Sequence, residues 1–178
     1  MERYVALLGS INVGGNRLKM ADLKAALEGE GFANVATVVA SGNVLFDHPR
    51  AADPVLGGEI EALVKRAFGI SSFAAVRTRA EIARAVANNP FAHDGEEKFV
   101  HTLFLEHPLV RADFDRFAAE FTGPERVAMG DGVLYADYAV GVGRSALDPA
   151  MRKARLIKGR ATARNMRSLR RILDKMDD

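Results

Sequence analysis

The feature that most constrains the fold is the order in which apolar runs, helical patterns and glycine turns follow one another. Strands are predicted at 3–9 and 70–76, helices at 19–32 and 54–69, and a β-hairpin at 34–48. The hairpin consists of two β-branched runs on either side of Gly42-Asn43, a dipeptide typical of a two-residue turn. The resulting order, β-α-β-β-α-β, is that of a ferredoxin-like unit.

The same order begins again after a short helix and a polar linker at 79–97. A strand is predicted at 99–107, a helix at 109–121 and a second hairpin at 125–140, turning at Asp131-Gly132. By residue type, Gly130–Tyr135 aligns with Ser41–Phe46, which indicates a degenerate tandem repeat. The second copy has no evident closing strand, because 146–159 and 162–176 favour helices, the latter capped by Thr162.

We therefore predict an α+β fold: a tandem ferredoxin-like (β-α-β-β-α-β) pseudo-repeat with antiparallel sheets and a C-terminal basic helix. The predicted parts are a first repeat at 1–78, a helix and linker at 79–97, a second, degenerate repeat at 98–145, and C-terminal helices with a basic face at 146–178. The chain of 178 residues contains no cysteine, and it is long enough to bury a core without disulfides.

Charge is distributed unevenly along the chain. Residues 1–149 contain 15 Lys and Arg against 20 Asp and Glu, whereas 150–178 contain 10 against 3. Helical spacing places the basic residues of the last segment on one side and its apolar residues on the other. The candidate polyanion-binding residues are Arg160, Arg164, Arg167, Arg171 and Lys175, and the residues expected to pack are Met166, Leu169, Ile172, Leu173 and Met176. This pattern suggests a phosphate-bearing partner such as nucleic acid; the alternative is a solvated face, or one that pairs with the acidic body of the chain.

A glycine loop follows the first predicted strand. Gly9 and Gly14 have the spacing of a nucleotide-binding P-loop, but Gly15-Asn16 stands where Lys and Ser or Thr are required, so we exclude an NTPase. Parallel first and second strands would bring this loop to the same sheet edge as the first hairpin turn. The candidate ligand-binding residues there are Asn12, Gly14, Gly15, Asn16, Ser41, Gly42 and Asn43. The alternative is a tight structural turn.

A second glycine motif, Gly141-Val142-Gly143-Arg144-Ser145-Ala146, matches the loose dinucleotide pattern G-x-G-x-x-A. The preceding strand belongs to a hairpin, and no acidic residue follows at the distance that would hold a ribose, so a Rossmann site is not expected. Arg144 and Ser145 remain candidate phosphate ligands, and the alternative is a plain glycine turn.

No catalytic motif, metal site or cofactor is predicted. The four histidines lack metal-ligand spacing, there is no G-x-S-x-G elbow, and Asp113 with Asp115 is typical of a solvated helix face. The sequence has no run of about eighteen apolar residues, so we expect a cytoplasmic protein with no membrane partner.

Four motifs together resemble the bacterial family known as domain of unknown function 1697 (DUF1697). They are Leu7–Gly15 (LLGSINVGG), Ser41–Phe46 (SGNVLF), Gly141–Leu147 (GVGRSAL) and Thr162–Ser168 (TARNMRS). The sequence departs from the family pattern at Gly9-Ser10, where the family has Arg-Gly, at Ala146 for lysine, and at Met166 for an aromatic residue. The resemblance implies a two-part α+β fold and no established activity. Among the residues at matching positions, Asn165 is worth testing in addition to the candidates named above.

Three functional hypotheses follow. The leading one is a non-catalytic binder of a phosphate-bearing partner, nucleic acid rather than a metabolite, through the basic helix and the glycine loops. The second is a small enzyme or metabolite-binding protein with a site between 10–16 and 41–43. The third is a scaffold that self-associates through its sheet edges.

Overall fold

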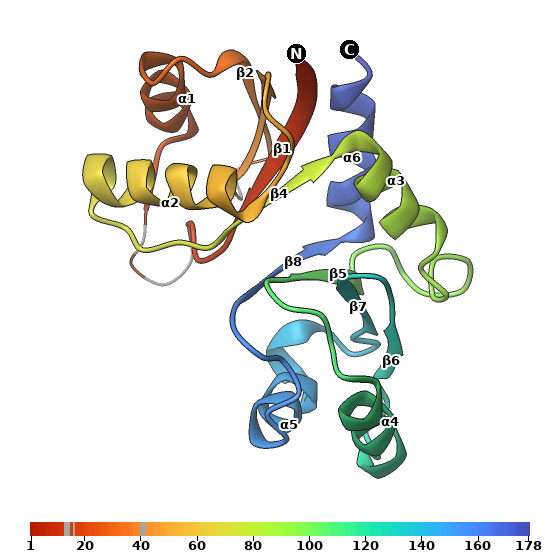
Figure 1. The fold of residues 1–178 in the computed structure, drawn as a ribbon. Coiled ribbons are helices and arrows are strands. Elements are labelled where there is room, and N and C mark those ends of the chain that lie inside the picture. The colour runs from red at the N-terminus through yellow and green to blue at the C-terminus, as the bar shows by residue number, and fades with distance from the viewer. Residues whose placement is uncertain (13–14, 16, 40–41) are drawn as a thin grey trace. The chain divides into compact units, whose positions relative to one another are not determined.

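The computed structural model describes residues 1–12, 15, 17–39 and 42–178 (Figure 1). The chain forms two compact units. Unit 1 comprises Met1–Ala83 together with Arg170–Asp178, and unit 2 comprises Arg84–Leu169. The last helix therefore begins in unit 2 and ends in unit 1.

Unit 1 contains the first ferredoxin-like repeat. Its elements are β1 (Glu2–Leu8), α1 (Met20–Gly29), β2 (Ala33–Val38), β3 (Asn43–His48), α2 (Pro54–Phe68) and β4 (Ala74–Thr78), followed by α3 (Arg79–Ala87). The strands form an antiparallel sheet in the order β2-β3-β1-β4. Helices α1 and α2 cover one face of this sheet (Figure 1), and Leu23, Leu27, Leu56 and Ile60 pack there against Tyr4, Leu8 and Phe46.

Unit 2 repeats this arrangement. Its elements are β5 (Val100–Leu105), α4 (Arg111–Glu120), β6 (Arg126–Met129), β7 (Val133–Asp137), the 3-10 helix η1 (Val142–Arg144), α5 (Leu147–Lys153), β8 (Ala161–Asn165) and α6 (Met166–Met176). The sheet order β6-β7-β5-β8 is the counterpart of that in unit 1, and all its pairs are antiparallel. Helices α4 and α5 cover one face, where Phe114, Phe117, Leu147 and Met151 pack against Leu103 and Leu134. The predicted tandem ferredoxin-like fold is confirmed.

The prediction that no strand closes the second repeat is wrong. Strand β8 occupies Ala161–Asn165, pairs with β5, and precedes a helix that begins only at Met166. Thr162 is therefore not the helix cap; Asn165 caps α6 by accepting a hydrogen bond from the backbone N–H of Ser168 at 2.9 Å. The segment Thr-Ala-Arg-Asn has little β-propensity of its own, so pairing with β5 decides its conformation.

The alignment of the two hairpins by residue type differs by one residue from the equivalence that the two sheets show. In the sheets, Leu7 pairs with Asn43, and Phe104, at the equivalent place in β5, pairs with Val133. Asn43 thus corresponds to Val133, whereas residue type had set it against Gly132. A one-residue displacement reverses which sheet face each side chain occupies, so only the ladder registers reveal the true equivalence.

The described helices include none that is both long enough and apolar enough to cross a membrane.

Candidate functional site

The end of β1 and the first hairpin turn lie together, as the parallel arrangement of β1 and β2 predicted. The backbone N–H of Leu8 donates to the Gly42 carbonyl at 2.9 Å. Gly42 has φ +78, and a Cβ atom there would lie 3.1 Å from the Leu8 Cβ and 3.2 Å from the Ile11 Cβ. Glycine is needed at this turn both for its backbone conformation and for the close approach of the loop.

The asparagine side chains at this edge form hydrogen bonds within the fold. Asn12 has φ 56, and its Oδ1 accepts from the backbone N–H of Leu18 at 2.9 Å. Asn43 is fully buried, and its Nδ2 donates to the Val38 carbonyl at 2.9 Å. Both amides therefore stabilise the loop and the hairpin.

For the remaining residues predicted at this edge, the structure gives little information on a site. The Gly15 carbonyl accepts from the backbone N–H of Arg17 at 3.0 Å. Gly14, Asn16 and Ser41 lie outside the described residues. A ligand role for this group of residues stays a prediction.

The second glycine motif forms a turn that leads through η1 into α5. Gly141 has φ +91 and Arg144 is exposed to solvent. The Ser145 hydroxyl donates to Glu125 Oε1 at 2.5 Å and accepts from the backbone N–H of Leu147 at 3.0 Å. Glu125 is only 6% exposed, and its Oε2 has no hydrogen-bond partner among the described residues. Ser145 thus joins the start of α5 to a buried carboxyl group.

Two arginines occupy equivalent positions in the two units. Arg77 in β4 pairs with Val5 of β1, and Arg164 in β8 pairs with Thr102 of β5. In both, the guanidinium Nη1 donates at 2.8 Å to the carbonyl of the preceding residue. In both, burial lowers the pKa of the guanidinium, to about 10 for Arg164.

Sequence reasoning missed this equivalence. The signal was present in AAVRT before α3 and ATARN before α6, where the arginine is followed by a helix-capping residue. Thr78 caps α3: its Oγ1 accepts from the backbone N–H of Glu81, whose carboxylate accepts in return from the Thr78 N–H. Asn165 is likewise the N-cap of α6, where its Oδ1 accepts from the backbone N–H of Ser168.

The predicted basic helix is present, with a later start. Along α6, Met166, Leu169, Ile172 and Met176 are buried, and Arg167, Arg171 and Lys175 are exposed. Arg160 and Arg164 precede α6 and so do not belong to its face, which corrects the predicted geometry of the stripe.

The five predicted polyanion-binding residues differ in their partners. Arg164 is buried and donates to Thr162 Oγ1, Arg160 binds Glu106, and Lys175 donates to Asp178 at 2.8 Å. Arg167 and Arg171 have no ion-pair partner in the described part of the chain. Some other exposed arginines do form such pairs, as Arg50 does with Glu59 and Arg66 with Glu30.

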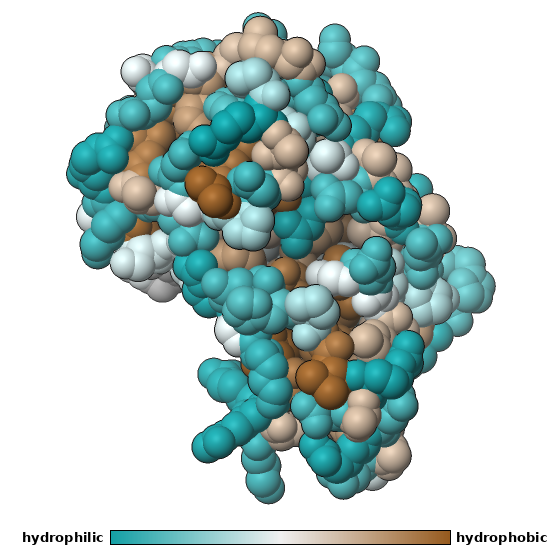
Figure 2. Space-filling view, in the orientation of Figure 1, coloured by the Kyte–Doolittle hydropathy of each residue, from teal (hydrophilic) through white to brown (hydrophobic). Residues whose placement is uncertain are grey.

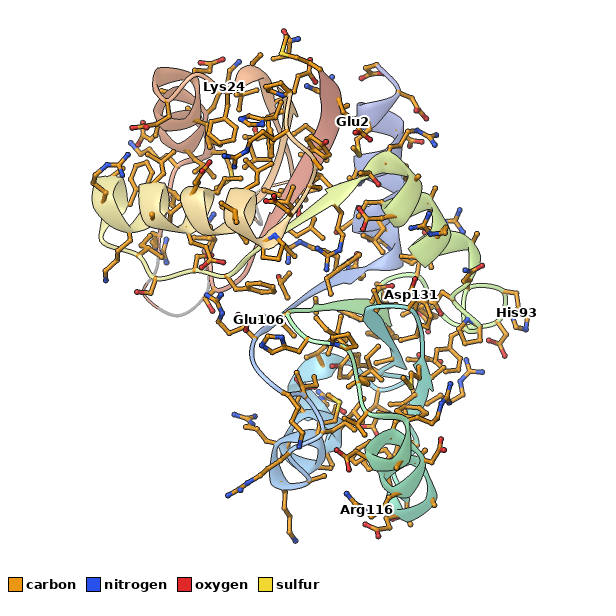
Figure 3. The ribbon with its side chains drawn as sticks, in the orientation of Figure 1. Glu2, Lys24, His93, Glu106, Arg116 and Asp131 are labelled. Atoms are coloured by element: carbon orange, nitrogen blue, oxygen red, sulfur yellow. The ribbon has the colours of Figure 1, made fainter. Side chains whose placement is uncertain are left out.

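Glu106, which follows β5 and is labelled in Figure 3, holds the segment before β8. It accepts from the backbone N–H of Arg160 at 2.7 Å and from its Nη2 at 2.9 Å. These hydrogen bonds lower the pKa of the Glu106 carboxyl below its ordinary value.

Glu106→Gln is expected to reduce stability at neutral pH and to have little effect in acid. Because the folded-state pKa is lowered, the interaction stabilises the protein above the unfolded-state pKa and is lost as the pH falls through the folded-state pKa. Chemical unfolding of both proteins across an acid pH series measures this; a stability difference that does not shrink in acid would contradict it.

Among residues 1–12, 15, 17–39 and 42–178, no three His, Asp or Glu side chains are grouped so as to hold a metal ion.

Comparison with known proteins places the chain in a family. The model of the family described as "Protein of unknown function (DUF1697)" matches residues 1–135, and the chain belongs to this family. A solved structure titled as that of the conserved bacterial protein SP0830 from Streptococcus pneumoniae has the same fold, with a TM-score of 0.76 and 20% sequence identity. The alignment covers 100% of this chain and 99% of that one. No curated protein matches the chain.

Proposed function

We propose that this protein is a non-catalytic binder of a phosphate-bearing polyanion, nucleic acid in the first instance, and that the exposed face of α6 makes the contact. The observation that carries the proposal is that Arg167 and Arg171 are exposed without a carboxylate partner in the part of the chain that the structure describes. Guanidinium groups left in this state are suited to phosphate oxygens, which they bind through a planar fork of donors.

The geometry of α6 supports a backbone contact. Residues four apart in a helix lie on the same face, about 6 Å apart along the axis. Arg167 and Arg171 are such a pair, and Lys175 is the next residue in the series. The opposite face is buried at Met166, Leu169 and Ile172, so the helix has a defined orientation and presents these cations outward.

Two further observations favour α6 over the ligand site predicted where β1 ends beside the first hairpin turn. Residues 150–178, which include α6, hold 10 basic against 3 acidic residues, so this segment is net positive. At that edge of the unit 1 sheet, the side chains of Asn12 and Asn43 already form hydrogen bonds with the protein's own backbone. A small-molecule site at that edge stays a prediction with less support.

The double variant Arg167→Ala/Arg171→Ala is expected to weaken binding to a DNA duplex and to flatten its salt dependence. Each phosphate contact contributes about 0.9 to the slope of log K against log salt, so the slope should fall by about two units. Fluorescence anisotropy with labelled DNA across a salt series measures it.

A matched control removes the same charge elsewhere. Arg50→Ala/Arg66→Ala also deletes two exposed arginines, but these are paired with Glu59 and Glu30. This control is expected to keep most of the slope. No DNA binding at low salt, or an equal loss in both double variants, would overturn the proposal.

A further inference from the structure

A second group of exposed cations lies at the C-terminal end of α5. Arg152 and Lys153 are in the last turn of the helix and Arg155 is in the turn that follows, and all three are exposed. None of the three has an ion-pair partner in the described residues. Figure 2 shows hydrophilic side chains projecting into solvent from the region of α5. We call Arg152, Lys153 and Arg155 the α5 cluster.

The turn that holds Arg155 is one that ordinarily contains glycine. The backbone N–H of Leu156 donates to the Met151 carbonyl and that of Arg155 to the Arg152 carbonyl, both at 3.1 Å, which is the Schellman arrangement of a helix end. Arg155 occupies its left-handed position with φ 52. A side chain at such a position strains the backbone, whereas glycine does not.

The next two basic residues are bound within the fold, unlike the α5 cluster. Lys158 donates to the Arg155 carbonyl at 2.8 Å and lies 3.7 Å from Asp113, and Arg160 is held by Glu106. These contacts fix the course of the chain after α5. The strained turn at Arg155 is therefore followed by a segment held in place, and the exposed Arg155 guanidinium has no ion-pair partner in the described residues.

We propose that the α5 cluster is a second phosphate-binding surface, separate from the face of α6, and that it takes the backbone of double-stranded nucleic acid. The inference rests on the proposed function for the class of partner and adds the surface and the strandedness. Three cations within four residues concentrate positive potential at one end of α5, which suits closely spaced phosphates.

The preference for a duplex follows from where the aromatic residues lie. Proteins that bind single strands stack bases on exposed aromatic side chains. Here the large apolar side chains that are exposed in the described chain are one methionine and five valines, and no Phe or Tyr is among them. Binding without stacking relies on phosphate charge, which is denser along a duplex than along a single strand.

The substitution Arg155→Gly separates a structural role of Arg155 from a binding role, because it is expected to raise the stability of the protein while it weakens binding. Removal of the strained side chain is expected to raise the Tm by about 2 °C. Loss of the cation is expected to lower the slope of log K against log salt for a DNA duplex by about one unit. Arg155→Lys keeps both charge and strain, so it should retain wild-type Tm and slope.

The test titrates wild type, Arg155→Gly, Arg155→Lys and Arg152→Ala/Lys153→Ala with a DNA duplex, the matching single strand and vesicles containing phosphatidylserine. The expected result is that wild type binds the duplex more tightly than the other probes, and that Arg155→Gly and Arg152→Ala/Lys153→Ala weaken duplex binding. Duplex binding that Arg167→Ala/Arg171→Ala weakens while the α5 variants do not would overturn this inference and leave the proposed function standing. Preference for the single strand or for vesicles would also overturn it, and no binding to any probe would overturn both.

Discussion

Gly57→Ala is expected to lower the free energy of unfolding by about 2–3 kcal/mol, because α2 approaches β4 too closely at this point to admit a side chain. A Cβ atom at position 57 would lie 2.7 Å from the Ala74 carbonyl oxygen and 4.0 Å from the Val76 Cγ2. The Ala74 oxygen belongs to the backbone of a strand paired with β1, so it cannot move aside without disturbing the sheet. The helix must shift instead, at the expense of the contacts of Leu56 and Ile60 in the core.

The next residue provides the control. Gly58 is in the same helix, is exposed, and has no described atom within 4 Å of the place where a Cβ would stand. Gly58→Ala is therefore expected to raise the free energy of unfolding by about 0.5–1 kcal/mol through helix propensity alone. Urea unfolding of the two variants isolates the packing effect, since both gain the same helix propensity. A Gly57→Ala protein as stable as wild type would contradict the close approach of α2 to β4.

Ser145→Ala is expected to destabilise the protein by about 2–3 kcal/mol, which is large for the loss of one hydroxyl group. The hydroxyl is the hydrogen-bond donor to Glu125 Oε1, while Oε2 has no partner in the described chain. Without Ser145, the buried carboxyl group would keep no described hydrogen-bond donor. The backbone N–H of Leu147 at the start of α5 would lose its acceptor as well.

A double-mutant cycle tests this explanation. Replacing Glu125 by methionine removes the group that Ser145 satisfies, so Glu125→Met/Ser145→Ala should be less destabilised than the sum of the two single variants. The coupling energy is measured from urea unfolding of the four proteins. Strictly additive losses would mean that the two side chains do not depend on each other. Because Ser145 is engaged in this way, a role for it as a phosphate ligand receives no support from its contacts.

Most of the fold was predictable because local pattern and tertiary context agree. The hairpin at Gly42-Asn43, the helix over Pro54–Phe68 and the apolar face of α6 follow from the period of their apolar residues and from turn chemistry. The candidate surface was predictable in part: Arg167 and Arg171 were placed on an exposed helical face by spacing alone. Arg160 and Arg164 were not, because the start of α6 depends on where β8 ends.

The sequence by itself determined the order of elements in the first repeat, the existence of a second copy, the family and the basic character of the C-terminal segment, since each is a property of neighbouring residues along the chain. The tertiary structure alone decided that Ala161–Asn165 is a strand, and which cations at α5 and α6 have no ion-pair partner among the described residues. These depend on hydrogen bonds and ion pairs between residues far apart in sequence. Such long-range partners do not change the periodic pattern of apolar residues in the segment that they pair with, so only the folded chain reveals them.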